Sequence, residues 1–229
     1  TRICTTIVCG GESTELIEPS PILSQNENED FLQTLNDSWG STQYVALCGT
    51  FPENFSVEQI DGLDFSGKKI FVDAVCNIDS WLQKGVELLK INKNEYCKFL
   101  DRMGIPQVKS SPQFWKMTAT AVLERLPIAN LVVTDEDSVV HAFRFTDKKL
   151  QGCQLQPPTV QVKNSVGAGD SFLAGWIYAE SRGLSMEECL VKATSVAVAR
   201  CEVERPWNIK LERVAELESA LAEAVEKVE

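Results

Sequence analysis

The strongest chemical signal in the chain is the glycine-rich stretch at residues 164–170 (NSVGAGD), which precedes an apolar run that starts at Phe172. The spacing of this run predicts a helix. Gly167 and Gly169 allow a tight turn in which the successive N–H groups of Gly167, Ala168 and Gly169 point the same way, and the helix dipole adds positive charge. The stretch therefore predicts an anion hole at a helix start, suited to the charge of a transferring phosphoryl group.

Asp170 stands at the mouth of this predicted helix, and two roles are open to it. A carboxylate at this position can cap the helix by accepting a hydrogen bond from a backbone N–H. It can also act as a general base that accepts a proton from an attacking hydroxyl beside the anion hole. The four residues G-A-G-D alone leave both roles open.

A second glycine-rich stretch, residues 62–69 (GLDFSGKK), is one residue short of a P-loop. The last position of a P-loop carries a hydroxyl that holds Mg²⁺, whereas here it is Lys69. A P-loop also follows a strand and opens a helix, whereas this stretch precedes a predicted strand. We interpret it as a turn.

Residues 164–175 resemble the C-terminal signature of the PfkB/ribokinase family of carbohydrate kinases, and their Asn-Ser-Val start is most similar to the sugar-phosphate branch. The resemblance implies an α/β fold, a ribokinase-like three-layer αβα sandwich with a mostly parallel sheet and a small β lid. It implies ATP-dependent phosphoryl transfer to a hydroxyl of a fructose-1-phosphate, fructose-6-phosphate or tagatose-6-phosphate class of substrate. Asp170 would deprotonate that hydroxyl, and the N–H groups of Gly167, Ala168 and Gly169 would stabilise the transition state.

Residues 90–95 (KINKNE) resemble the K-P-N-x-x-E segment of the same family. The resemblance implies that Lys90, Asn92 and Thr134 contact the nucleotide and that Asn92 and Glu95 organise Mg²⁺, a cation that prefers such oxygen ligands. The alternative is an ordinary strand-to-helix junction with Asn92 as its cap.

The N-terminal residues are similar to a lid strand of the sugar-phosphate branch: Thr1 and Arg2 precede β-branched residues, a Gly-Gly turn and residues 14–19 (TELIEP). Arg2 would then bind the substrate phosphate, and the alternative is an exposed arginine on an edge strand. Residues 48–52 (CGTFP) are similar to a substrate-side loop. We expect residues 1–20 to form part of the lid and 21–229 the C-terminal portion of the α/β domain, with the first core strands missing.

Two segments depart from the family pattern. Residues 135–137 (DED) replace a glycine-rich nucleotide loop with three carboxylates, which are unfavourable beside a triphosphate. Residues 199–202 (ARCE) are bulkier and more charged than is usual near the adenine. The acidic loop keeps open the alternative of a non-catalytic member that binds a ligand. A separate alternative is a kinase for an unphosphorylated sugar or a nucleoside, in which Arg2 would not contact the substrate.

The chain has eight cysteines and one histidine, with no C-x-x-C pair, which argues against a zinc site. Scattered cysteines in apolar runs are typical of buried, reduced thiols in a cytoplasmic protein. His141 lies in residues 139–143 (VVHAF), which predicts a strand-face histidine rather than a catalytic one.

The motifs are connected by short apolar runs that alternate with helical patterns, and this alternation predicts a parallel sheet covered on both faces. The predicted strands are residues 1–8, 14–17, 44–48, 69–74, 86–91, 131–134, 139–145 and 160–162. The predicted helices are residues 27–35, 80–84, 93–100, 112–125, a helix from 186 to 197 capped by Ser185, and 211–228.

Composition sets the remaining limits. The 229 residues are 44% hydrophobic and carry a formal charge of −11, with a sequence pI of about 4.7. This balance argues against nucleic acid as a partner, and no apolar run is long enough to cross a membrane. We expect a sugar or sugar phosphate as the partner, and a homodimer that forms through the lid strands.

Overall fold

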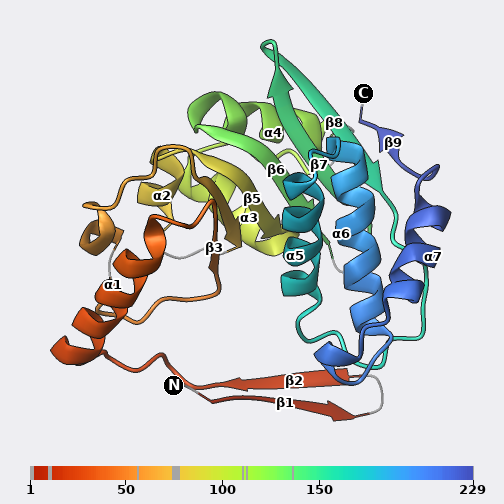
Figure 1. The fold of residues 1–229 in the computed structure, drawn as a ribbon. Helices are drawn as coiled ribbons and strands as arrows, with labels where there is room; N and C mark the ends of the chain where they lie inside the picture. Colours follow the sequence, from red (N-terminus) through yellow and green to blue (C-terminus); the bar gives the residue numbers. More distant parts are fainter. Residues whose placement is uncertain are drawn as a thin grey trace.

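The computed structural model describes residues 3–9, 12–55, 57–73, 78–109, 111, 113–135 and 137–228, which form one large and one small sheet (Figure 1). The strands are β1 (Cys4–Cys9), β2 (Glu12–Ile17), β3 (Tyr44–Cys48), β4 (Lys69–Asp73), β5 (Val86–Asn92), β6 (Ile128–Thr134), β7 (Val140–Thr146), β8 (Lys149–Leu155) and β9 (Glu226–Lys227). The α-helices are α1 (Gln25–Trp39), α2 (Asp79–Gln83), α3 (Lys93–Arg102), α4 (Phe114–Arg125), α5 (Ala168–Ser181), α6 (Met186–Cys201) and α7 (Leu211–Leu221). Two short 3₁₀ helices are η1 (Val57–Ile60) and η2 (Pro206–Asn208).

The seven strands β3 to β9 of the large sheet lie in chain order. β3 to β6 run parallel, and β7, β8 and β9 are each antiparallel to the preceding strand. The connections from β6 to β7 and from β7 to β8 are short, which favours antiparallel neighbours, whereas β9 follows a long segment that contains α5, α6 and α7. Asp147 and Lys148 join β7 to β8 with φ angles of 50° and 61°, as a type I′ hairpin turn requires. The predicted α/β class is confirmed, with an antiparallel edge added to the parallel strands.

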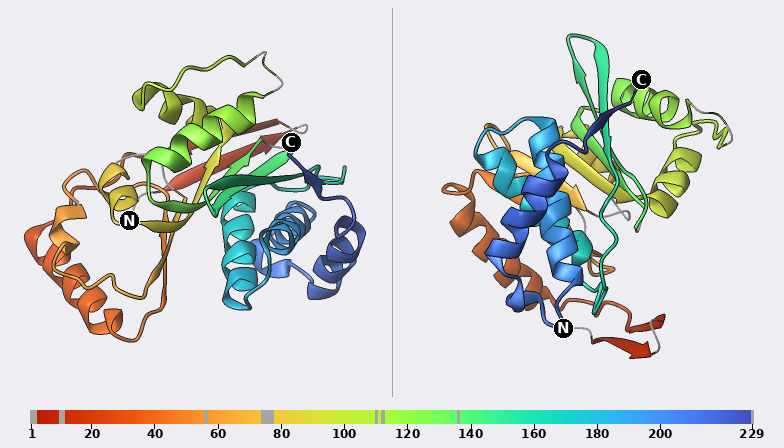
Figure 2. Two further views of the ribbon diagram at one scale, coloured as in Figure 1. Left: turned by 90° about the horizontal axis from the view of Figure 1, so that it is seen from above. Right: turned by 90° about the vertical axis from the view of Figure 1, so that its right-hand side faces the viewer.

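Helices cover both faces of the large sheet, which gives three layers (Figure 2). Buried strand residues alternate between two cores, because successive side chains of a strand point to opposite faces. The core shared with α2, α3 and α4 contains Val72, Leu89 and Leu131. The core shared with α5 and α6 contains Phe71, Leu88 and Val132. In the second core Gly175 lets α5 approach α6, since a Cβ there would lie 2.9 Å from Cα of Ala193.

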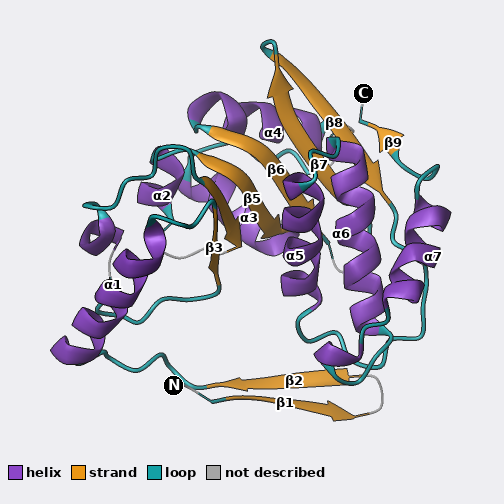
Figure 3. Cartoon of the chain, in the orientation of Figure 1, coloured by secondary structure: helices purple, strands orange, loops and turns teal. Residues whose placement is uncertain are grey.

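The two-stranded sheet stands apart from the large one, beyond the end where the parallel strands finish and α5 begins (Figure 3). β1 and β2 pair antiparallel from Cys4 opposite Ile17 to Cys9 opposite Glu12. Ile7, Leu16 and Ile17 are each more than half exposed on this hairpin. Its position within residues 1–20 agrees with the range expected for a lid, a role that stays a prediction.

Two predicted elements are wrong. Residues 160–162 form no strand, because β8 ends at Leu155 and the following Pro157 and Pro158 have no N–H to continue a ladder. The predicted helix 211–228 stops at Leu221, and the chain then pairs with β8 as β9, where the N–H of Val228 donates to the carbonyl of Gly152 at 3.0 Å. β8 itself was not predicted.

The cysteines agree only in part with the prediction of buried thiols. Cys153 and Cys189 are buried, and burial raises the pKa of each thiol to about 12. Cys4 and Cys48 are exposed. His141 is the strand-face residue predicted: it lies on β7, is 6% exposed, and stacks on Trp115 with ring centroids 4.3 Å apart.

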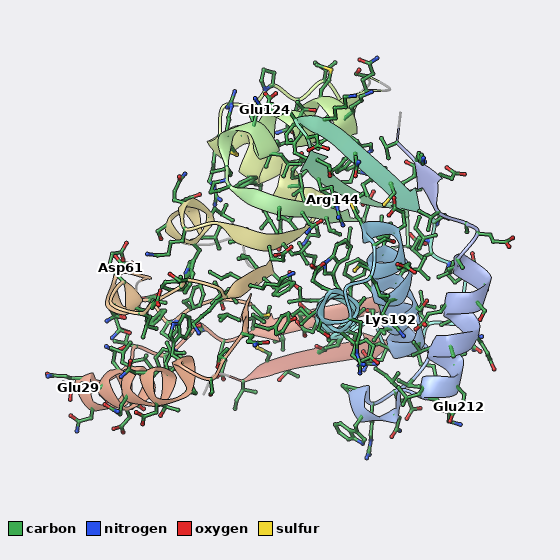
Figure 4. The ribbon with its side chains drawn as sticks, turned by 45° about the horizontal axis from the view of Figure 1, so that its top comes forward. Glu29, Asp61, Glu124, Arg144, Lys192 and Glu212 are labelled. Carbon is green, nitrogen blue, oxygen red and sulfur yellow. The ribbon has the colours of Figure 1, made fainter. Side chains whose placement is uncertain are left out.

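The acidic surplus is spread over the surface rather than gathered at one place. Glu29, Glu124 and Glu212 are exposed on α1, α4 and α7, at separate edges of the molecule (Figure 4). In the described part of the chain, no helix is both long enough and apolar enough to span a membrane.

Candidate active site

Helix α5 begins at a left-handed glycine. Gly167 is its N-cap residue with a φ of 79°, a conformation that glycine adopts at little cost. Asn164 shapes the preceding turn: its Oδ1 accepts a hydrogen bond from the N–H of Val166 at 2.9 Å, and its Nδ2 donates to the carbonyl of Glu204 at 2.9 Å. Within the described residues no side chain caps α5. N–H groups in its first turn therefore stay available to an anion.

The predicted anion-hole residues are at this start, but their N–H groups differ in use. The N–H of Ala168 donates to the carbonyl of Ser165 at 3.0 Å, so it helps to close the turn. Gly167 and Gly169 have no such bond among those found between the described residues. The geometry favours these two glycines as the donors to a bound anion.

Asp170 lies in the first turn of α5 and is exposed. The N-cap role considered for it is wrong, because Gly167 occupies the cap position and no side chain bonds there. Oδ2 of Asp170 lies 3.8 Å from the position that a Cβ on Gly167 would have, so the carboxylate stays beside the turn. The role of Asp170 as a general base stays a prediction.

Lys90 reaches the same turn from the sheet. Its Nζ lies 2.8 Å from the position that a Cβ on Gly169 would have, and it donates to Oδ2 of Asp73 at 2.7 Å. The Lys90 side chain is 8% exposed and that of Asp73 is 15% exposed. The pair brings the ends of β4 and β5 to the start of α5. Glycine at position 169 leaves room for this ammonium where it lies, whereas a Cβ there would require Nζ to shift.

Cys48 ends β3 opposite Asp73 of β4, and the N–H of Gly49 donates to the carbonyl of Asp73 at 3.0 Å. Although Cys48 as a whole is exposed, partial shielding of its thiol from water raises the pKa of the thiol, and the negative charges of Asp73 and Asp170 raise it further. The predicted substrate-side loop, which starts at Cys48, therefore begins beside the same carboxylates. Its thiol stays protonated near neutral pH.

Asn92 and Glu95 form a capping box at the start of α3. Oδ1 of Asn92 accepts from the N–H of Glu95 at 2.9 Å, and Oε2 of Glu95 accepts from the N–H of Asn92 at 3.1 Å. Thr134 pairs with Asn92 across β5 and β6, so it ends the neighbouring parallel strand. The capping alternative for Asn92 is thus realised, while the nucleotide and Mg²⁺ roles of these residues stay predictions.

The first carboxylate of the acidic loop has a partner. Nζ of Lys93 donates to Oδ2 of Asp135 at 2.6 Å, and this bond raises the pKa of Lys93. The pair links the start of α3 to the end of β6. Much of the negative charge expected from Asp135 is therefore offset by Lys93.

Arg200 lies beside the same turn, on the last turn of α6. It is 1% exposed, and its Nη1 donates to the carbonyls of Val203 at 2.8 Å and Asn164 at 3.2 Å. Its Nε lies 3.7 Å from the Cβ position of Gly167. The bulky, charged segment that departed from the family pattern thus packs against the predicted anion hole.

Sequence reasoning missed Asp73 and Arg200 as site residues. One signal could have found Asp73: it ends a predicted parallel strand, and ligands bind outside the carboxyl ends of such strands. Arg200 gives no comparable signal, because its helix begins far from the turn. The predicted phosphate residue Arg2 lies outside the described residues. Among the described residues, no group of three or more His, Cys, Asp or Glu side chains is placed to hold a metal ion.

The chain is similar to known carbohydrate kinases in sequence and in fold. The model of the pfkB family of carbohydrate kinases matches residues 1–210. A tagatose-6-phosphate kinase of Staphylococcus epidermidis is 22% identical over 230 residues, which cover 95% of this chain and 69% of the relative.

Solved structures agree in fold. Phosphofructokinase-2 from Escherichia coli, crystallised with substrates and products, matches with a TM-score of 0.76 at 17% identity, over 93% of this chain and 67% of that one. A possible 1-phosphofructokinase from Thermotoga maritima matches with a TM-score of 0.71 at 16% identity, over 100% of this chain and 71% of that one. These likenesses confirm the predicted ribokinase-like fold. Because the family model covers most of its length, the chain belongs to the PfkB family of carbohydrate kinases.

Proposed function

We propose that this carbohydrate kinase transfers the γ-phosphoryl group of ATP to a hydroxyl of a sugar phosphate. The observation that carries the proposal is the uncapped start of α5, with the exposed Asp170 in its first turn and Lys90 beside Gly169. An uncapped helix start binds anions, and a carboxylate beside it can accept a proton. Family membership supports this use of the site.

In the proposed reaction the sugar hydroxyl oxygen attacks the γ-phosphorus in line. Its bond to phosphorus forms while the bond from phosphorus to the β,γ-bridging oxygen breaks, and ADP leaves with that oxygen. The hydroxyl proton passes to Asp170. The N–H groups of Gly167 and Gly169 bind the charge on the transferring group, and the N–H of Ala168 holds the turn.

The sugar-phosphate class is supported by the relatives, which are named as a tagatose-6-phosphate kinase and a phosphofructokinase-2. We expect fructose-1-phosphate, fructose-6-phosphate or tagatose-6-phosphate as substrate, with the phosphate held by Arg2. Arg2→Ala should raise the KM for the sugar phosphate at least tenfold, because it removes a bidentate phosphate contact. An unchanged KM would favour the alternative substrate class, an unphosphorylated sugar or a nucleoside.

ATP would contact Lys90, Asn92 and Thr134, which lie at or near the ends of β5 and β6. The ion pair between Lys93 and Asp135 supports nucleotide binding, since it offsets one of the carboxylates that would repel the triphosphate. Isothermal titration calorimetry with ATP tests this point. If no ATP binds, the non-catalytic alternative replaces the kinase proposal.

Mg²⁺ fits the oxygen ligands of Asn92 and Glu95, and when bound it would neutralise phosphate charge. Glu95→Gln separates this role from capping, because glutamine at this position still accepts the hydrogen bond from the N–H of Asn92. We expect Glu95→Gln to keep its thermal stability but to need a higher Mg²⁺ concentration for half-maximal rate. An unchanged Mg²⁺ requirement would leave Glu95 as a capping residue alone.

The decisive test of the reaction is Asp170→Asn, which preserves side-chain size but removes the base. We expect kcat in a coupled ADP-release assay to fall by about 10²–10⁴-fold. Asp37→Asn on the exposed face of α1 is the matched control and should retain the wild-type rate. Full activity in Asp170→Asn would refute the assigned mechanism.

We also propose that two copies of the chain pair through the β1–β2 hairpin. The exposed Ile7, Leu16 and Ile17 are apolar side chains that a partner would cover. A related structure is described as the tetrameric form of phosphofructokinase-2, which supports self-association in this family. Sedimentation velocity should give a dimer for the wild type and a monomer for Leu16→Lys; a wild-type monomer would refute the pairing.

A further inference from the structure

Arg200 differs from the other buried cation of the site in its lack of a counter-charge. It is 1% exposed, yet no carboxylate among the described residues lies within ion-pair distance of it. Its Nη1 bonds only to two carbonyl oxygens, and its Nε is buried without any hydrogen-bond partner in the described structure. Lys90, by contrast, is paired with Asp73 at 2.7 Å. A buried charge without a partner is energetically unfavourable, and a bound anion beside Arg200 would compensate this charge.

The unpartnered Nε lies beside the turn that starts α5. A Cβ on Gly167 would lie 3.7 Å from Nε of Arg200 and 3.8 Å from Oδ2 of Asp170. The guanidinium and the carboxylate therefore both lie beside Gly167. The first turn of α5 thus has a paired ammonium beside Gly169, an unpaired guanidinium beside Gly167, and N–H groups that no side chain caps.

We propose that Arg200 is a positioning residue of the phosphoryl site, whose charge is offset by the bound phosphoryl group. It holds the turn through the carbonyl of Asn164 and places a permanent positive charge behind Gly167. The ligand is a tetrahedral oxyanion of the phosphate type. This inference rests on the proposed function, because it assigns the phosphoryl group to the start of α5.

A purely structural role for Arg200 does not explain why a charged side chain is buried at this position. Two carbonyl acceptors can be satisfied by a neutral donor, which would carry no desolvation cost for a charge. Arg144 also has a buried Nε without a hydrogen-bond partner, but Arg200 is almost fully buried as well, whereas Arg213 meets Glu202 through Nε at 2.8 Å. The position of Arg200 instead adds positive potential where the helix start is already positive.

The test is thermal stability and isothermal titration of the purified chain with inorganic phosphate, for the wild type, Arg200→Met and Arg200→Lys. We expect the phosphate dissociation constant to rise at least tenfold in Arg200→Met and by a smaller factor in Arg200→Lys, which keeps the charge. Without phosphate, the melting temperature of Arg200→Met should be equal to or above that of Arg200→Lys. Arg125→Met, which removes a guanidinium bound to the carbonyl of Met103 on α4's side of the sheet, should bind phosphate as the wild type does.

Equal phosphate affinity in the wild type and Arg200→Met would overturn the proposal. If Arg200→Met does not fold, Arg200→Gln takes its place, because glutamine keeps a donor for the carbonyl of Asn164; failure of both to fold would assign Arg200 a structural role and also overturn the proposal. The experiments distinguish failure of this proposal from failure of the kinase mechanism. If phosphate binding depends on Arg200 but Asp170→Asn keeps full activity, the mechanism assigned to Asp170 is refuted and the role of Arg200 stands.

Discussion

Helices α5 and α6 pack side by side on one face of the sheet, and they begin in opposite ways (Figure 1). α6 starts with a capping box, in which the N–H of Glu188 donates to Oγ of Ser185 at 3.2 Å and the N–H of Ser185 donates to Oε2 of Glu188 at 2.8 Å. α5 starts at Gly167 with no capping side chain. The difference shows that local side chains stabilise the start of α6, whereas the start of α5 has no such cap and is the proposed anion site.

The same capping box recurs at α1, with Ser24 and Glu27, and at α3, with Asn92 and Glu95. α2, α4 and α7 also start without a capping side chain, so the lack of a cap alone does not distinguish α5. α5 differs in starting at the left-handed Gly167, with Arg200 beside that glycine and Lys90 beside Gly169. α3 stands between the two cases, since its cap is made by the residues for which nucleotide and Mg²⁺ roles are predicted. The comparison therefore sets helix starts that are capped for stability against the start for which binding is proposed.

Removal of the cation beside the open start should have the largest effect. Lys90→Met leaves Asp73 buried without its partner, and we expect the free energy of unfolding to fall by about 3–5 kcal/mol. The measurement is urea unfolding followed by fluorescence. The double variant Lys90→Met/Asp73→Asn should recover most of this stability yet stay inactive. A double variant as unstable as Lys90→Met would show that the pair is not the cause.

Protonation of His141 tests the other face of the sheet, away from both helix starts. Burial lowers the pKa of His141 from its ordinary 6.5 to about 4. Between these values the unfolded chain binds more protons than the folded one, so stability falls as the pH drops from 6.5 towards 4. The loss attributable to His141 reaches about 3 kcal/mol at pH 4 and below.

Chemical unfolding at pH 7.0 and pH 4.5 measures this effect, with His141→Phe as the comparison. Phenylalanine keeps an aromatic ring against Trp115 but cannot bind a proton. The part of the pH dependence that disappears in His141→Phe is the contribution of His141. An identical pH dependence in the two proteins would contradict the assignment.

A side chain added in the first turn of α5 should reduce activity more than stability. In Gly169→Ala the new Cβ would lie 2.8 Å from Nζ of Lys90, so this flexible ammonium has to move. We expect kcat/KM to fall by about 100-fold, as small displacements of positioning groups commonly cause. Gly62→Ala, whose Cβ would meet nothing within 4 Å, is the matched control and should have wild-type kinetics. Equal kinetics in both variants would show that the position of Lys90 does not matter.

Loss of the cap on α6 should have the smallest effect, and it should reduce stability rather than activity. Ser185→Ala removes the acceptor for the N–H of Glu188, and we expect the free energy of unfolding to fall by about 1 kcal/mol. The activity per folded molecule should not change. A loss of activity at unchanged stability would remove the distinction between the two helix starts.

Local sequence patterns predicted the elements whose signal is complete within one short segment. β3 was predicted with the correct bounds, and the Ser185 cap of α6 is present. Prediction was wrong where a distant partner decides the outcome. Residues beyond Leu221 continue a helical apolar pattern, but Glu226 and Lys227 pair with β8 as a strand. The energy of that pairing comes from residues about seventy positions earlier, which a local pattern cannot contain.

In the candidate site, too, some features follow from local sequence and others from tertiary packing. The turn at Gly167, the carboxylate at Asp170 and the capping geometry at Asn92 follow from residue types at fixed spacing, because glycine conformation and helix caps are local properties. The contacts of Lys90 with Asp73 and of Arg200 with the turn depend on which strands are neighbours and on how α6 packs against α5.

The sequence by itself predicted an anion-binding helix start with a carboxylate beside it, and it determined the family to which the motif belongs. Only the tertiary structure decided the charges around it: Lys90 is held by Asp73, Lys93 offsets Asp135, and Arg200 is buried without a carboxylate. The physical reason is that the Coulomb energy and the desolvation of a charge depend on distance and burial in space, which residues far apart in the chain set together.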